Sequence, residues 1–69
     1  MSPEKLVLMA NQIGKFFASQ PHGDALAAIA DHLRIFWDPR MRATILAHLD
    51  KGGAGLDPLV LMAVQSLKG

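Results

Sequence analysis

Histidines are the side chains of this sequence best suited to bind a metal or to move a proton, because the chain contains no cysteine. Without cysteine, disulfides, iron–sulfur clusters and thiolate zinc sites are excluded. His22, His32 and His48 lie on three different segments, so no pair has the i, i+3 or i, i+4 spacing that places two ligands on one helix face. We therefore expect no metal site.

Other catalytic arrangements are equally weak in this sequence. Asp31 and His32 are adjacent, but adjacent helical residues point about 100° apart and do not face each other. The glycine-rich stretch 52–55 lacks the spacing and the following Lys-Ser/Thr of a phosphate-binding loop, and the end of a helix explains it better. We expect no catalytic residue, and no cofactor bound by this chain.

An unusual cluster of arginine and aromatic residues surrounds the Asp38-Pro39 dipeptide. Phe36 and Trp37 stand directly before it, and the arginines are Arg34, Arg40 and Arg42. In one interpretation the aromatic residues are core and the arginines are solvated. In the other the cluster is a binding corner, because tryptophan and arginine are common anchors of interfaces. The two are compatible if the tryptophan lies inside and the arginines outside.

Helix signals position this cluster within the chain. Ser2, Asp38 and Asp57 each precede a proline, and a capping oxygen followed by proline at the first helical position starts a helix. Gly52 and Gly53 suit the left-handed end of a helix. The helices are expected at residues 3–19, 24–37, 39–50 and 58–67. The sequence thus predicts an all-α fold, a small single-domain bundle of three to four short helices.

Apolar residues recur at helical spacing in each of these segments, which predicts one buried stripe per helix. The expected stripes are Leu6, Met9, Ala10, Ile13, Phe16 and Phe17; Leu26, Ile29, Ala30, Leu33, Phe36 and Trp37; Met41, Ile45, His48 and Leu49; and Val60, Ala63, Val64 and Leu67. Gly14 interrupts the first helix, and we expect it to permit close approach of another helix.

The amino-acid composition indicates that the chain binds another protein. The 69 residues are 51% hydrophobic, and a chain this short buries only about 60% of its unfolded surface, so the surplus apolar surface calls for a binding partner. The net charge of +1 is too small to favour nucleic acid or a membrane surface. No apolar run approaches the roughly 20 residues of a membrane span, and no secretory signal is visible, so we expect a cytoplasmic protein.

A DNA-binding function is the alternative suggested by two helices joined at a tight break, which can imitate a helix-turn-helix. The second helix would be residues 39–50, where Arg40 and Arg42 could reach the phosphates. The rest of that helix carries apolar residues such as Ile45 and Leu49 and is poorly suited to a DNA groove. A free-standing enzyme is weaker still, since no constellation of catalytic residues is visible.

Three longer stretches resemble a known family. They read LMANQIG at residues 8–14, followed by Phe16 and Phe17; IADHLR at 29–34, running into FWDPRMR at 36–42; and GGAGLDPLV at 52–60. Together they resemble the delta subunit family of NAD-dependent, molybdenum-containing formate dehydrogenases. The resemblance covers nearly the whole chain, and the stretch 36–42 is its most specific part.

This resemblance implies a place in an enzyme complex that oxidises formate to carbon dioxide and reduces NAD⁺. The alpha subunit of such a complex carries molybdenum on two pyranopterin guanine dinucleotides (bis-molybdopterin guanine dinucleotide) and Fe–S clusters, and the beta and gamma subunits carry FMN and further clusters. The delta subunit carries no cofactor, associates with this assembly, and is implicated in its stability or maturation. A transient maturation chaperone for the catalytic subunit is the alternative.

The helical pattern, taken with this resemblance, suggests which residues would contact the catalytic alpha subunit and its beta and gamma partners. We expect off-stripe apolar residues to form the contact and arginines to form its polar rim; the same apolar surface could drive self-association of the isolated chain. The candidate interface comprises Leu8, Arg34, Ile35, Phe36, Trp37, Arg40, Met41, Arg42, Leu46, Leu61 and Met62.

Overall fold

A computed structural model describes residues 2–20 and 23–68 of the chain. It contains the helices α1 (Pro3–Ala18), α2 (Ala25–Phe36), α3 (Pro39–Asp50) and α4 (Pro58–Ser66), with no strand in the described ranges. The all-α fold predicted from the sequence is therefore confirmed. Each helix end lies within one residue of the expected position. Pro21 and His22, which lie between the first two expected helices, are outside the described residues.

Side-chain caps start three of these helices. The Lys5 amide donates to Ser2 Oγ at 3.3 Å, and the Met41 amide donates to Asp38 Oδ1 at 2.9 Å, as the cap-proline pattern predicts. Asp24 caps α2 in the same way through the Ala27 amide. The prediction is only half right at Asp57, which precedes α4 but makes no side-chain cap bond.

The end of α3 follows the glycine pattern. Gly52 and Gly53 have φ angles of 113° and 67°, in the left-handed region that favours glycine. In this conformation the Gly53 amide reaches back to the His48 carbonyl at 3.0 Å and satisfies one of the last acceptors of the helix. The chain can then turn away from α3 and lead toward α4.

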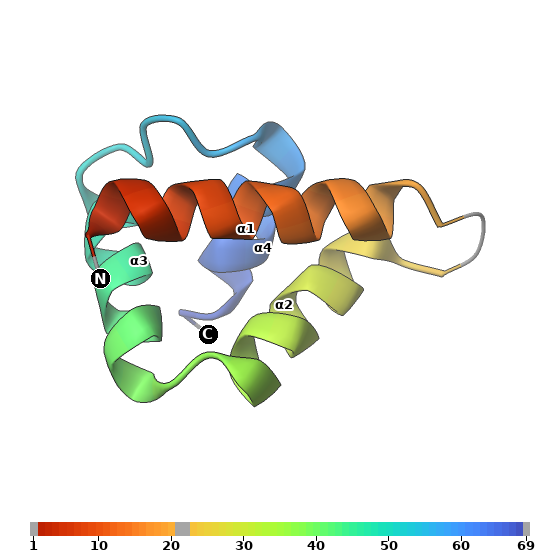
Figure 1. Cartoon of the computed structure of the whole chain (residues 1–69), viewed down its shortest axis with the longest axis horizontal. Helices are drawn as coiled ribbons and strands as arrows, with labels where there is room; N and C mark the ends of the chain where they lie inside the picture. Colours follow the sequence, from red (N-terminus) through yellow and green to blue (C-terminus); the bar gives the residue numbers. More distant parts are fainter. Residues whose placement is uncertain (1, 21–22, 69) are drawn as a thin grey trace.

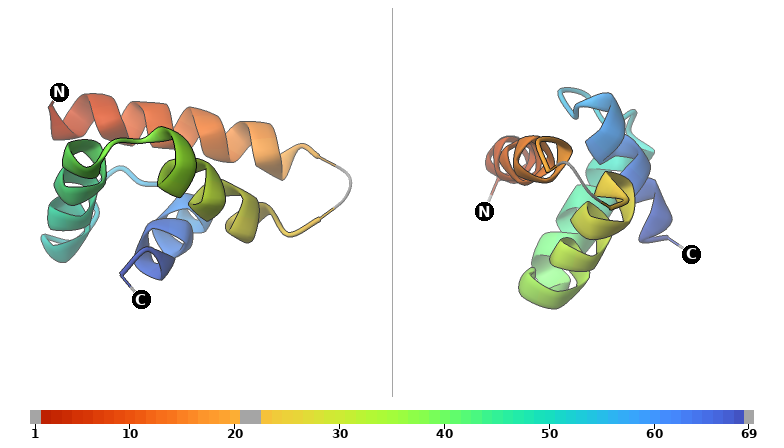
Figure 2. Two further views of the ribbon diagram at one scale, coloured as in Figure 1. Left: turned by 90° about the horizontal axis from the view of Figure 1, so that it is seen from below. Right: turned by 90° about the vertical axis from the view of Figure 1, so that its right-hand side faces the viewer.

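Helices α1, α2 and α3 pack around the short helix α4. Figure 1 shows α1 lying along one side of the molecule, with α3 beneath its first half and α2 beneath its second half. Figure 2 shows the same arrangement from two further sides. The short helix α4 lies between them and packs against all three. The buried apolar side chains are those of Leu6, Val7, Ala10, Ile29, Ala30, Leu33, Trp37, Ile45, Leu49, Val60, Ala63 and Val64.

Gly14 lies where α1 and α4 come closest. A Cβ atom added at this glycine would overlap Val60 Cγ2 of α4, and Ile29 Cδ1 of α2 would lie 3.7 Å away. Any side chain here would therefore separate the helices. The expectation that Gly14 permits close approach of another helix is confirmed.

Phe16 and Phe36, two residues expected in the core, are instead 60% and 70% exposed. In α1 the buried face runs through Val7, Ala10 and Gly14. Because glycine has no hydrophobic side chain, Gly14 was not counted in the predicted buried stripe of α1. The predicted stripe included the exposed Phe16 instead. In α2 the helix ends at Phe36; Trp37 is extended (φ −84°, ψ 137°) and occupies the buried position.

A side chain of α1 holds the connection between α3 and α4. The Asn11 amide nitrogen donates to the Gly55 carbonyl at 2.9 Å, and its oxygen accepts from the Asp57 amide at 3.0 Å. His48 Nε2 lies 2.7 Å from the Ala54 carbonyl of the same connection. These bonds give the turn a fixed path across the molecule and pair polar backbone groups that no helix satisfies.

Candidate interface

The corner between α2 and α3 is built by its own arginines. Arg42 Nη1 donates to the carbonyls of Arg34, at 2.9 Å, and of Trp37. The Arg34 carbonyl lies in the last turn of α2 and the Trp37 carbonyl directly follows the helix, so neither has an intrahelical donor, and a cation there satisfies them and offsets the helix dipole. Arg34 in turn bonds Asp31 at 3.1 Å and the Ser66 carbonyl at 3.4 Å. Both arginines thus take part in interactions within the chain.

Trp37 belongs to the core of this corner. Its side chain is 4% exposed and joins the cluster formed by Leu33, Ile45 and the other buried apolar residues. The arrangement is the compatible one foreseen from the sequence, with the tryptophan inside and arginine side chains outside. Ile35 and Phe36, directly before it, are 73% and 70% exposed and present apolar surface to solvent.

The other candidate residues do not form a single surface. Leu8 and Met62 are exposed, but they lie on α1 and α4 and line neither of the two hollows described below. Leu46 and Leu61 are half-buried and pack against the core. At 100° per residue, Leu8 points about 140° away from Ile13 around α1, so it cannot share a face with the groove lined by Ile13.

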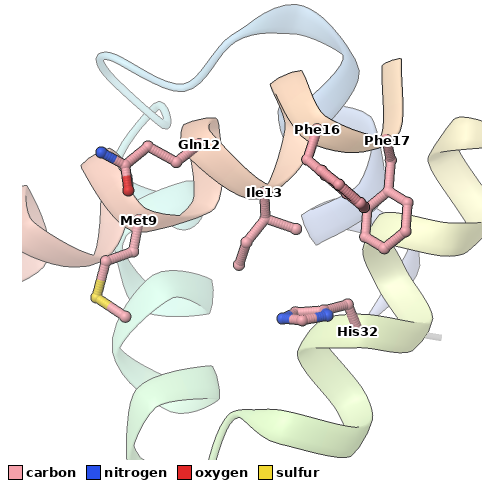
Figure 3. A pocket seen from close by; sticks show the side chains of 6 residues that line it. All are labelled: Met9, Gln12, Ile13, Phe16, Phe17 and His32. Atoms are coloured by element: carbon pink, nitrogen blue, oxygen red, sulfur yellow. The ribbon is translucent and has the colours of Figure 1, made fainter. Parts of the chain in front are cut away.

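An apolar groove of about 380 Å³ lies between α1 and α2. Figure 3 shows the side chains of Met9, Ile13 and Phe17 pointing from α1 into this space, with His32 of α2 facing them. Gln12 and Phe16, both exposed, complete the lining. We call this hollow the α1–α2 groove.

The aromatic rings of Phe16, Phe17 and His32 line the α1–α2 groove, and their row continues to Phe36 outside the lining. The ring centroids of Phe16 and Phe17 are 5.2 Å apart, those of Phe17 and His32 5.9 Å, and those of His32 and Phe36 4.7 Å. These separations suit favourable aromatic contacts, so the row of rings has a defined shape. Both of its end members, Phe16 and Phe36, are largely exposed.

A second, smaller hollow of about 210 Å³ lies between α1 and the start of α3. It is lined by Leu6, Asp38, Arg40, Met41 and Thr44. It contains the charged groups that the α1–α2 groove lacks. Asp38 already accepts the Met41 amide as a helix cap. The Arg40 guanidinium has no hydrogen bond or ion pair to any other residue in the described ranges.

Nothing in the described ranges suggests a metal centre or a membrane-spanning segment. No three histidine, aspartate or glutamate side chains of residues 2–20 and 23–68 gather closely enough to hold a metal ion. His22, one of the three histidines considered from the sequence, lies outside these ranges. None of the helices described here has both the length and the apolar character needed to cross a bilayer.

The structure is that of a small helical protein with apolar hollows between its helices. A comparison with family models shows the family to which the chain belongs. Residues 5–64 match the model of the NADH-dependent formate dehydrogenase delta subunit, FdsD. The chain belongs to this family. The match spans α1, α2, α3 and most of α4, so it covers both hollows. A comparison with individual curated proteins finds no significant match.

Membership of the FdsD family confirms the resemblance read from the sequence. None of the residues that line the α1–α2 groove, however, was among the candidate interface residues. Met9, Ile13 and Phe17 have the spacing of a buried stripe, and the sequence gives no sign that α2 leaves them partly uncovered. The one available signal was that His32 and Phe36, four residues apart, align on one face of α2.

Proposed function

We propose that this chain is a non-catalytic, cofactor-free accessory subunit of a cytoplasmic NAD-dependent formate dehydrogenase. It binds the catalytic alpha subunit, within an assembly that includes the beta and gamma subunits, and supports its assembly or stability. The complex converts formate and NAD⁺ to carbon dioxide and NADH. The observation that carries the proposal is the open apolar groove between α1 and α2 in a chain of the FdsD family.

The exposed apolar surface supports a role in binding. Leu8, Phe16, Ile35, Phe36 and Met62 are all more than half exposed, in a chain of only 69 residues. A larger subunit that covers some of these side chains would remove apolar surface from water, at about 25 cal/mol per Å². Because the partner binds the folded chain, binding also stabilises the fold.

The contacts of the described histidines support a non-catalytic role. The His32 ring packs between Phe17, which it meets edge-to-face, and Phe36, and His48 bonds the Ala54 carbonyl in the connection before α4. Both imidazoles therefore contribute to packing or loop structure. In this proposal the molybdenum cofactor, the Fe–S clusters and FMN are all held by the other subunits.

Purification from the native host tests the proposal. A tagged copy of the chain is isolated, the co-purifying chains are identified by mass spectrometry, and molybdenum and iron are measured. We expect a formate dehydrogenase with metal content and a fixed ratio of this chain to the alpha subunit. Recovery of the alpha subunit only in its cofactor-free form would favour the transient maturation chaperone. If no formate dehydrogenase subunit is recovered, the proposed function is wrong.

A strain that lacks the gene for this chain provides the complementary experiment. We expect a tagged alpha subunit from a deletion strain to have lower formate-dependent NAD⁺ reduction and less bound metal, or to dissociate more readily. Restoring the chain on a plasmid controls for indirect effects. Equal yield, metal content and stability with and without the chain would contradict a role in assembly or stability.

A further inference from the structure

We draw no further inference here: the strongest candidate, the groove between α1 and α2 lined by Met9, Ile13, Phe17 and His32, is an unpartnered apolar face, and nothing in the structure shows what covers it.

Discussion

Arginines in one short stretch of this chain have different roles. Arg42 donates to two carbonyls at the end of α2, Arg34 bonds Asp31 and Ser66, and Arg40 has no partner in the described ranges. In the sequence all three are equally plausible interface residues. The difference arises from where the chain turns at Asp38, because this turn places the Arg42 side chain within reach of the Arg34 and Trp37 carbonyls.

Replacing Arg42 should destabilise the chain itself. We expect Arg42→Ala to lower the free energy of unfolding by about 1.5 kcal/mol, because two carbonyls at the end of α2 lose a charged donor. Urea denaturation followed by the fluorescence of Trp37, the one tryptophan in the sequence, measures the effect. Arg40→Ala is the matched control and should change this free energy by less than about 0.5 kcal/mol. Equal losses in the two variants would contradict the structural role of Arg42.

The candidate interface could be predicted from the sequence only in part. The surplus of apolar residues and the exposure of Ile35, which lies off the buried stripe, could be predicted, whereas Phe36 was expected in that stripe and is exposed. The burial of Trp37 was also expected from the stripe, but the backbone that achieves it was not, because the chain leaves the helix at Trp37, two residues before the proline. The α1–α2 groove could not be predicted either. The space between two helices depends on how they cross, whereas the hydrophobic pattern describes one helix at a time.

At the scale of helices, the most specific contact is the crossing of α1 and α4 at Gly14. Val60, which faces this glycine, is almost completely buried, so it has little room to move. A glycine in the middle of a 16-residue helix costs about 1 kcal/mol relative to alanine. The close packing of two helices compensates for this cost.

Replacing Gly14 should therefore reverse the usual benefit of alanine in a helix. We expect Gly14→Ala to lower the free energy of unfolding by about 1–2 kcal/mol, because overpacking at Val60 outweighs the gain in helix propensity. Thermal denaturation by circular dichroism gives the result. Gln12→Ala, two residues away and exposed, should stay within about 0.5 kcal/mol of the wild type. A more stable Gly14→Ala variant would show that α1 and α4 are not closely packed.

Most of the helical structure was predictable, because its signals are local. Ser2 and Asp38 cap helices at the expected residues, and Gly52 and Gly53 end α3. The faces that the helices bury were predicted less well. Phe16 was placed in the core because the hydrophobic pattern ignores glycine, whereas the tertiary structure uses Gly14 as a contact.

The whole molecule combines a small core with open apolar surface. Its core consists of the twelve buried side chains named above, and no buried side-chain polar group in the described ranges lacks a hydrogen bond. Domains of about this size have a limited margin of stability, because they bury a smaller share of their surface than larger ones. Stability of the free chain is therefore sensitive to single truncations in the core.

Truncation of a core side chain should destabilise the free chain more than the chain bound to its partner. Leu33 is completely buried, so we expect Leu33→Ala to cost about 2–5 kcal/mol and to abolish cooperative thermal unfolding of the isolated chain. Leu8→Ala, at an exposed position, serves as the control and should unfold like the wild type. If the proposed function is right, co-expression with the alpha subunit should restore the helical structure and the protease resistance of the Leu33→Ala chain. An isolated Leu33→Ala chain with unchanged thermal unfolding would contradict the importance of this core.

The bonds from Asn11 to Gly55 and Asp57 also affect the order of events on the ribosome. The helix that carries Asn11 is made first, whereas its partners in the connection and in α4 are made last. At about 5–20 residues per second, α1 is complete roughly 2–8 s before Val60 is added. During this interval Leu6, Ala10 and Gly14 have no α4 to cover them. The bundle can therefore close only after translation is nearly finished.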